Sequence, residues 1–229
     1  MNDFKALRYK LLVTIINNKK GRDIVRAVKK VGVEGDTVLI GRGTPTKKEK
    51  KLWDLDMEPT REIVFNLLTE DLVEASLNEI LEKTPLNKPG KGIAFVIDVA
   101  FVAGICHACD LRDKDKFIEF EEGNMTDQTK HVLLIIIVGK GNASIVIDAA
   151  CSAGAAGGTI MTGRGSGVHE KAKLFGIDIE PEKEVVLIVV EKENHKEILR
   201  VINEKSKLNE PGQGIAFVLP LDHVVGLRQ

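Results

Sequence analysis

The chain has 229 residues, of which 43% are hydrophobic and 29% are charged. Its 33 basic and 34 acidic residues leave a formal net charge of −1, which gives no global electrostatic attraction to nucleic acid or to an anionic membrane. No apolar run approaches the length of a membrane span and the first residues lack the apolar core of a signal peptide, so we expect a cytoplasmic protein without a membrane span.

The first half of the chain predicts six elements in the order strand, helix, strand, strand, helix, strand. Short runs rich in apolar and β-branched residues indicate the strands, and apolar residues three and four positions apart indicate the helices. The predicted strands cover residues 9–16, 37–40, 62–68 and 92–99, and the predicted helices cover 22–31 and 71–83. This order is typical of the ferredoxin-like α+β fold, in which both helices cover one face of a four-stranded antiparallel sheet.

An internal repeat predicts that the second half has the same fold. The segment LNKPGKGIAFV, residues 86–96, recurs as LNEPGQGIAFV, residues 208–218, and 208 minus 86 gives an offset of 122. The same offset gives strands at 132–138, 159–162, 184–190 and 214–219 and helices at 144–153 and 194–205. We therefore expect two tandem domains, residues 1–105 and 131–229, joined by a linker at 106–130. Within that linker, residues 117–120 favour an added edge strand.

The repeated segment is a turn that leads into a strand. Each copy has one proline that fixes φ and two glycines that can adopt positive φ and expose backbone N–H groups. Such a turn can hold an anion, although most Pro-Gly-x-Gly turns serve only as entries into strands.

Two segments after the second strand of each half are candidates for binding a partner protein. In the first half, Arg42 opens a polar stretch with four lysines that precede Trp53, the only tryptophan. In the second half, the matching segment runs from Arg164 to Phe175. One interpretation of the lysine run is a solvated face, and the other is a loop or short amphipathic helix that contacts a partner.

In these features the chain resembles the PII signal-transduction family of nitrogen regulators, which have a ferredoxin-like fold. The resemblance rests on Gly-x-Thr leading into Gly-x-Gly, on Asp71-Leu72-Val73 before the second helix, and on the glycine-rich turn. It extends over nearly the whole chain, once in each half. It implies a homo-oligomeric regulator that is not an enzyme and that controls a target protein through its long loop.

The resemblance also implies a site for a small anionic ligand, which in the family is ATP or ADP held between neighbouring subunits. Carried over by position, the residues of this site are Thr37, Lys88, Gly90, Gly92, Thr159, Gly212, Gly214 and Arg228. The lysine that the family has after the second turn glycine is Ile93 here and Ile215 in the other half. Because that cation is missing, we expect weakened nucleotide binding and leave the identity of the cofactor open.

A second hypothesis rests on Cys106 and Cys109, whose CxxC spacing is typical of redox pairs and of half a zinc site. It makes the protein a metal- or redox-responsive oligomeric scaffold. No residues combine a nucleophile, a base and an oxyanion site, which argues against an enzyme. We expect His169, His195 and His223 to be surface or edge histidines.

Overall fold

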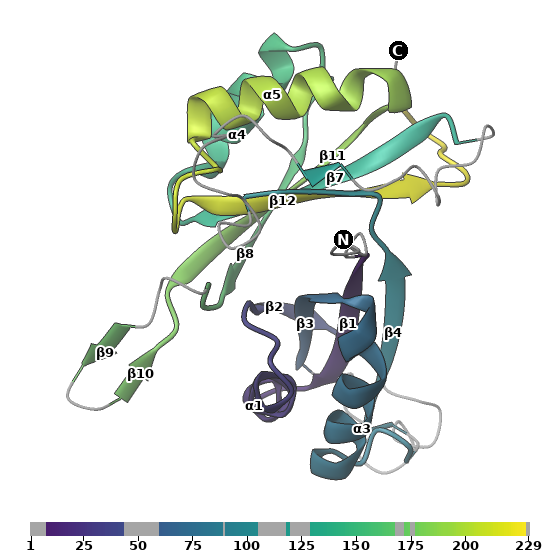
Figure 1. Cartoon of the computed structure of the whole chain (residues 1–229), viewed down its shortest axis with the longest axis vertical. Helices are drawn as coiled ribbons and strands as arrows, with labels where there is room; N and C mark the ends of the chain where they lie inside the picture. The colour runs from purple at the N-terminus through teal and green to yellow at the C-terminus, as the bar shows by residue number, and fades with distance from the viewer. Residues whose placement is uncertain are drawn as a thin grey trace, which may run out of the picture. The chain divides into compact units, whose positions relative to one another are not determined.

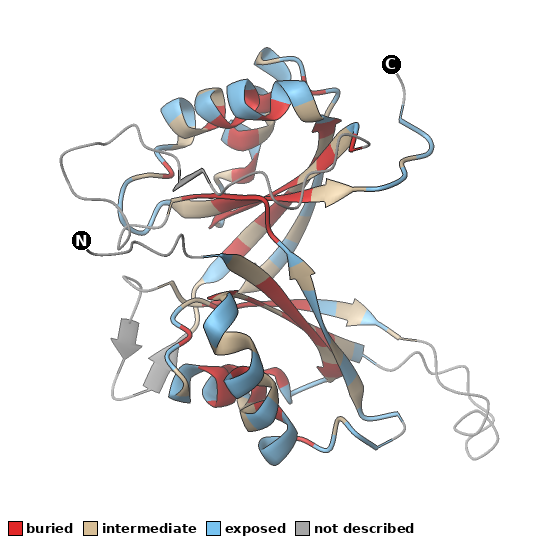
Figure 2. Cartoon of the chain, turned by 45° about the vertical axis from the view of Figure 1, so that its right-hand side comes forward, coloured by how far each residue is buried: buried red, intermediate tan, exposed pale blue. Residues whose placement is uncertain are grey.

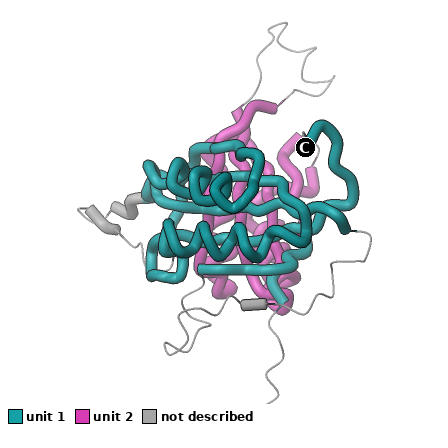
Figure 3. The backbone as a smooth tube through the Cα atoms, turned by 90° about the horizontal axis from the view of Figure 1, so that it is seen from above, with its two compact units in different colours: residues 1–9, 98–229 teal, residues 10–97 magenta. Residues whose placement is uncertain are grey.

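The structure, a computed structural model, describes residues 8–43, 60–88, 90–104, 118–119, 129–167, 172–174 and 177–227. The chain divides into two compact units, shown in Figure 3: unit 1 comprises residues 1–9 and 98–229, and unit 2 comprises residues 10–97. Among the described residues, no helix has the length and apolar character that a membrane crossing needs. The predicted domain limits at residues 105 and 131 stay a prediction.

Unit 2 has the predicted order of elements (Figure 1). They are β1 (Tyr9–Asn17), α1 (Gly21–Lys30), β2 (Thr37–Arg42), β3 (Thr60–Thr69), the 3-10 turn η1 (Glu70–Leu72), α3 (Val73–Lys83) and β4 (Gly92–Asp98). The strands are ordered β4-β1-β3-β2 in the sheet. The ferredoxin-like α+β prediction is therefore confirmed for this unit.

The core of unit 2 lies between this sheet and its two helices. Helix α1 directs one apolar face inward, because its apolar residues recur at helical spacing. Its residues and the inward residues of the strands and of α3 form one buried cluster: Leu12, Ile16, Ile24, Val25, Ala27, Val28, Val33, Val38, Val64, Leu68 and Ile80. Figure 2 shows this burial in red on the helices and strands.

Unit 1 repeats the order of unit 2, and 131 minus 9 again gives the offset of 122 for the first strand. Its repeated elements are β7 (His131–Gly139), α4 (Ala143–Ser152), β8 (Thr159–Arg164), β11 (Glu182–Glu191), η2 (Lys192–Asn194), α5 (His195–Ser206) and β12 (Gly214–Leu221). The same unit holds β5 (Phe101–Ala103), β6 (Ile118–Glu119) and the hairpin of β9 (Ala172–Leu174) with β10 (Ile177–Ile179). In Figure 1, α4 and α5 lie over one face of the sheet.

The core of unit 1 is larger, and small side chains let α4 pack closely. Ala149 and Ala150 of α4 are buried in one cluster with Ile198, Leu199 and Ile202 of α5. The alternating residues of β7 and β11 complete this cluster on the helix side of the sheet: Val132, Leu134, Ile136, Val138, Val186, Ile188 and Val190.

The sheet of unit 1 extends beyond β12 through strands that come from the end of the first half. The order is β8-β11-β7-β12-β5-β6. Strand β6 pairs with β5 through Val102 and Ile118, which confirms the edge strand predicted within residues 117–120. Strand β5 pairs in turn with β12 through Phe101 and Val218.

Candidate functional site

The glycine turn of unit 1 connects α5 to β12. Helix α5 ends at Lys207, which adopts a left-handed conformation (φ 55°) and donates its backbone N–H to Asn203 O at 2.7 Å. The turn then places Gly212 at φ 78° and Gly214 at φ 156°. A Cβ atom at Gly214 would lie 2.5 Å from Ile137 O, so only glycine fits where this turn passes β7.

The glycine turn of unit 2 has the same backbone conformation, with Gly90 at φ 76° and Gly92 at φ 146°. A Cβ atom at Gly92 would lie 2.5 Å from Ile15 O. Lys88 is exposed, and its backbone carbonyl accepts from Lys91 N at 3.3 Å. Gly92 and Gly214 therefore have a structural role, because each lets its turn pass close to the backbone of β1 or β7. This role is separate from the ligand binding that was predicted for them.

The two turns differ in charge at one matched position. Where unit 2 has Lys88, unit 1 has Glu210, and the Glu210 carboxylate lies 3.6 Å from Lys207 Nζ. Both side chains of that pair are more than half exposed, so the pair stabilises the turn little. The turn of unit 2 is therefore the more suitable of the two for an anion.

Within each unit, the predicted threonines do not lie beside the turns. Thr37 is buried at the start of β2 and pairs with Phe65, while the turn leads into β4 at the other edge of that sheet. Thr159 is exposed at the start of β8, also several strands away from β12. With neighbouring strands about 4.8 Å apart, each threonine lies about three strand spacings away from the glycine turn of its own unit.

Two glutamates that the sequence analysis missed fix the helix that follows the first strand of each half. Glu62 Oε2 accepts from Gly21 N at 2.6 Å, at the first residue of α1. Glu184 Oε2, at the matched position, accepts from Ala143 N at 2.9 Å and from Gly141 N at 3.0 Å. The sequence signal that could have indicated this role is that a glutamate recurs at the same position of two otherwise apolar strands.

The candidate partner loops are described in part. Arg42 is exposed at the end of β2, and Trp53 lies outside the described residues. In unit 1, Arg164 Nε donates to Glu180 Oε2 at 2.6 Å, and Gly165 N donates to Pro181 O at 3.0 Å. These bonds close the base of the segment that carries the β9–β10 hairpin. Phe175 falls between those two strands in the sequence and outside the described residues.

The remaining predicted residues, Cys106, Cys109 and Arg228, lie outside the described residues, so their roles stay predictions. Cys151, at the end of α4, is exposed and unpaired. In the ranges that the structure describes, no group of three or more His, Cys, Asp or Glu side chains is arranged to hold a metal ion.

The prediction that His195 is a surface or edge histidine is wrong, because its side chain is buried. This histidine is 4% exposed at the first residue of α5, and its Nδ1 donates to Lys192 O. Its ring meets the ring of Phe101 edge to face, with centroids 6.4 Å apart. Helical spacing turns position 195 inward with Ile198 and Leu199, which explains the burial. His223 is exposed as expected, and His169 lies outside the described residues.

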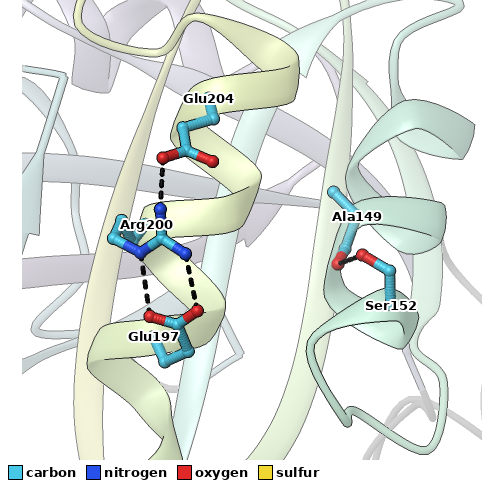
Figure 4. Close-up of polar contacts among 5 residues, drawn as sticks. All are labelled: Ala149, Ser152, Glu197, Arg200 and Glu204. Carbon is cyan, nitrogen blue, oxygen red and sulfur yellow. Dashed lines mark hydrogen bonds and ion pairs between the residues drawn. The ribbon is translucent and has the colours of Figure 1, made fainter.

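The clearest pKa shifts belong to surface ion pairs. Figure 4 shows Arg200 of α5 between Glu197 and Glu204, and Arg200 donates from Nε to Glu197 at 2.8 Å. The hydrogen bond from Arg200 lowers the pKa of Glu197, and the same bond raises the pKa of Arg200. Lys140 directly follows the last residue of β7, and its hydrogen bond with Glu182 raises the pKa of Lys140. These exposed pairs mark a solvated surface rather than a reactive site.

Comparison with known proteins gives a family match for the second half. Residues 131–229 match the model of the family described as Nitrogen regulatory protein P-II. Among solved structures, Arabidopsis thaliana PII bound to citrate is 28% identical over 41% of this chain and 78% of that chain, with a TM-score of 0.33. No curated protein sequence matches the chain.

Proposed function

Since residues 131–229 are related to the PII regulators, we propose that this chain is a cytoplasmic regulatory protein that senses a small anionic ligand and controls a partner protein of nitrogen metabolism. The family match carries the proposal. Because the family consists of regulators, the proposed function is signalling rather than catalysis.

The glycine turns are the proposed ligand sites. Gly90 and Gly212 both adopt left-handed conformations close to φ 77°, and each turn leads directly into a strand. Backbone in this conformation directs successive N–H groups to one side, which suits an anion such as a phosphate. Lys88 adds a positive charge to the turn of unit 2, and Glu210 adds a negative one to the turn of unit 1. We therefore propose that the first-half turn binds more tightly.

The β9–β10 hairpin is the proposed contact with the partner protein. It extends from the end of β8, and the ion pair of Arg164 with Glu180 fixes its base. A two-stranded ribbon offers backbone groups and side chains to a groove of another protein.

Calorimetric titration of the full chain tests the ligand proposal. The protein is titrated with ATP, ADP, AMP and 2-oxoglutarate, each with and without Mg²⁺. We expect saturable binding of at least one anion. If none of the four binds, the anion-sensing proposal fails, and zinc content and the oxidation state of Cys106 and Cys109 become the next measurements.

Matched charge variants locate the site. Lys88→Glu is expected to weaken binding by about ten- to hundredfold, because one charge-assisted hydrogen bond contributes about 1.5–3 kcal/mol. Glu210→Lys is expected to strengthen binding at the second turn. Arg26→Glu makes the same change of charge at an exposed position of α1 and serves as the control. Equal effects of Lys88→Glu and Arg26→Glu would contradict a site at the turn.

A further inference from the structure

The core of unit 2 contains three buried polar side chains, each from a different element. Thr14 lies on β1, Asn66 on β3 and Ser76 on α3, and all three residues are 0% exposed. Thr14 Oγ1, Asn66 Oδ1 and Ser76 Oγ have no hydrogen-bond partner within the part of the chain that the structure describes. Because a buried oxygen without a partner costs free energy, three of them in one core require an explanation.

The matched positions of unit 1 hold isoleucine in all three cases. With the offset of 122, the counterparts of these residues are Ile136, Ile188 and Ile198. All three isoleucines are at most 1% exposed and belong to the buried cluster of unit 1. The fold itself therefore does not require polar groups at these places, since unit 1 forms the same core without them.

Thr14 and Asn66 point to the helix side of the sheet of unit 2. Side chains two positions apart on a strand share one face. The residues two positions before and after Thr14 and Asn66 all belong to the buried cluster of unit 2: Leu12, Ile16, Val64 and Leu68. Both polar side chains are thus directed into the apolar core.

Thr14 and Asn66 are also close to each other. The register of β7 with β11, transferred by the offset, sets Thr14 opposite Val64, and the bond from Asn18 N to Thr60 O at 3.2 Å agrees with it. Asn66, two residues further along β3, is then a diagonal neighbour of Thr14, at a Cα distance of about 7–8 Å. The two side chains therefore lie over one small area of the sheet.

Ser76 faces this sheet from the helix above it. It lies four residues before Ile80 on α3, and residues four apart share a helix face. Ile80 is 0% exposed and belongs to the same buried cluster. The hydroxyl of Ser76 is therefore directed into the layer between α3 and the strands.

The three groups together can satisfy a water molecule. Asn66 Nδ2 donates to Gly35 O at 3.2 Å, which orients the amide, and Oδ1 is its acceptor. The hydroxyls of Thr14 and Ser76 can each donate or accept, and a buried water makes about three hydrogen bonds. Threonine and serine are also smaller than the isoleucines at these places in unit 1, which favours an additional small molecule.

We propose that the core of unit 2 binds an internal water molecule that bridges Thr14 Oγ1, Asn66 Oδ1 and Ser76 Oγ. The water joins β1, β3 and α3 through hydrogen bonds where unit 1 has apolar contacts. Strand β1 passes Gly92 of the glycine turn at Ile15 O, and α3 is the helix before that turn, so the water joins the two elements on either side of it. This site goes beyond the proposed function and needs none of its ligands.

Measurement of ¹⁷O magnetic relaxation dispersion on the full chain tests the proposal, because it reports long-lived bound water and not hydroxyl protons. The test variant combines Thr14→Ile, Asn66→Ile and Ser76→Ile, which gives unit 2 the core residues of unit 1. We expect it to lose the signal of at least one long-lived water per chain. Ser206→Ala is the control and should keep that signal, because Ser206 Oγ already donates to Ile202 O at 2.6 Å. An unchanged signal in a folded triple variant, with folding checked by circular dichroism, would overturn the proposal.

A double-mutant cycle gives a second readout, which decides the question if the triple variant does not fold. Thr14→Val keeps the shape of its side chain and removes the hydroxyl, and Ser76→Ala removes the other hydroxyl. If a water bridges them, each variant lowers the midpoint of urea denaturation, and the second substitution lowers it less when the first is present. If the hydroxyls have no partner, each variant raises the midpoint, which would overturn the proposal. Losses that simply add would assign separate partners to the two hydroxyls and would overturn it as well.

Discussion

Glu62 and Glu184 show how one residue type sets the geometry of both halves. A helix begins with backbone N–H groups that have no partner within the helix. Here a carboxylate from the neighbouring strand accepts from the N–H at the first helical residue, Gly21 in α1 and Ala143 in α4. The negative charge also interacts favourably with the helix dipole. Each glutamate therefore ties a strand, a turn and a helix together at one point.

Replacing either carboxylate is expected to destabilise its unit. Glu184→Ala should lower the free energy of unfolding by about 1–2 kcal/mol, because two backbone N–H groups lose their acceptor. Glu62→Ala should cost more, since Glu62 is almost fully buried. Urea denaturation followed by circular dichroism measures both, with the exposed Glu193→Ala as control. A Glu184→Ala midpoint equal to that of the control would contradict this role.

The ion pairs of Glu197 predict a dependence on pH. Its pKa is lowered in the folded protein, so the stabilisation is present above the unfolded pKa of about 4.3 and is lost as pH falls through the lower folded value. Glu197→Gln should therefore lower the melting temperature slightly at pH 7, and the difference from wild type should disappear once the pH falls below the lowered pKa of Glu197, because both side chains are then neutral. Thermal melts at pH 7 and at the lowest pH at which the protein stays folded check this. A difference that is the same at both pH values would rule out the ion pair as its cause.

At the scale of elements, the three-residue strand β5 stabilises both the sheet and the helix side of unit 1. Phe101 belongs to the buried cluster of unit 1 and meets the ring of His195. Through it the end of the first half contributes to the core beneath α5. A short strand of this kind fixes both the edge of a sheet and one end of a helix.

Truncating Phe101 tests that influence. Phe101→Ala should destabilise unit 1 by about 3–5 kcal/mol, the usual cost of removing a buried phenylalanine. Faster hydrogen exchange is expected in β5 and in the facing part of β12, because the strand pair loses its anchor. Leu81→Ala, at a half-exposed position of α3, is the control. Exchange in β12 that stays at the wild-type rate would contradict the anchoring role of Phe101.

At the scale of the whole molecule, local patterns predicted what depends on local physics. Apolar spacing gave α1 and α4 to within one or two residues, and the offset of 122 carried every element of unit 2 into unit 1. The partner of β5 was not predictable in this way. Pairing of Val102 with Phe217 joins residues far apart in sequence, and periodicity carries no information about which edge a strand joins.

For the candidate site, only the backbone conformation of the glycine turns could be predicted from the sequence. The glycines at 90, 92, 212 and 214 have the left-handed conformations expected of them, because proline and glycine act locally. The separation of Thr37 from the turn depends on strand order, and the roles of Glu62 and His195 depend on which face of an element is buried. These are tertiary properties that residue spacing does not encode.

The pairing of β5 with β12 has a consequence for synthesis of the chain. Residues 101–103 leave the ribosome more than a hundred residues before residues 216–218, with which they pair. At a translation rate of about 5–20 residues per second, the apolar β5 segment waits on the order of ten seconds for its partner. During that interval the first half can already be complete while its last strand is uncovered, so the nascent chain passes through a stage that exposes Phe101 to chaperones or to other nascent chains.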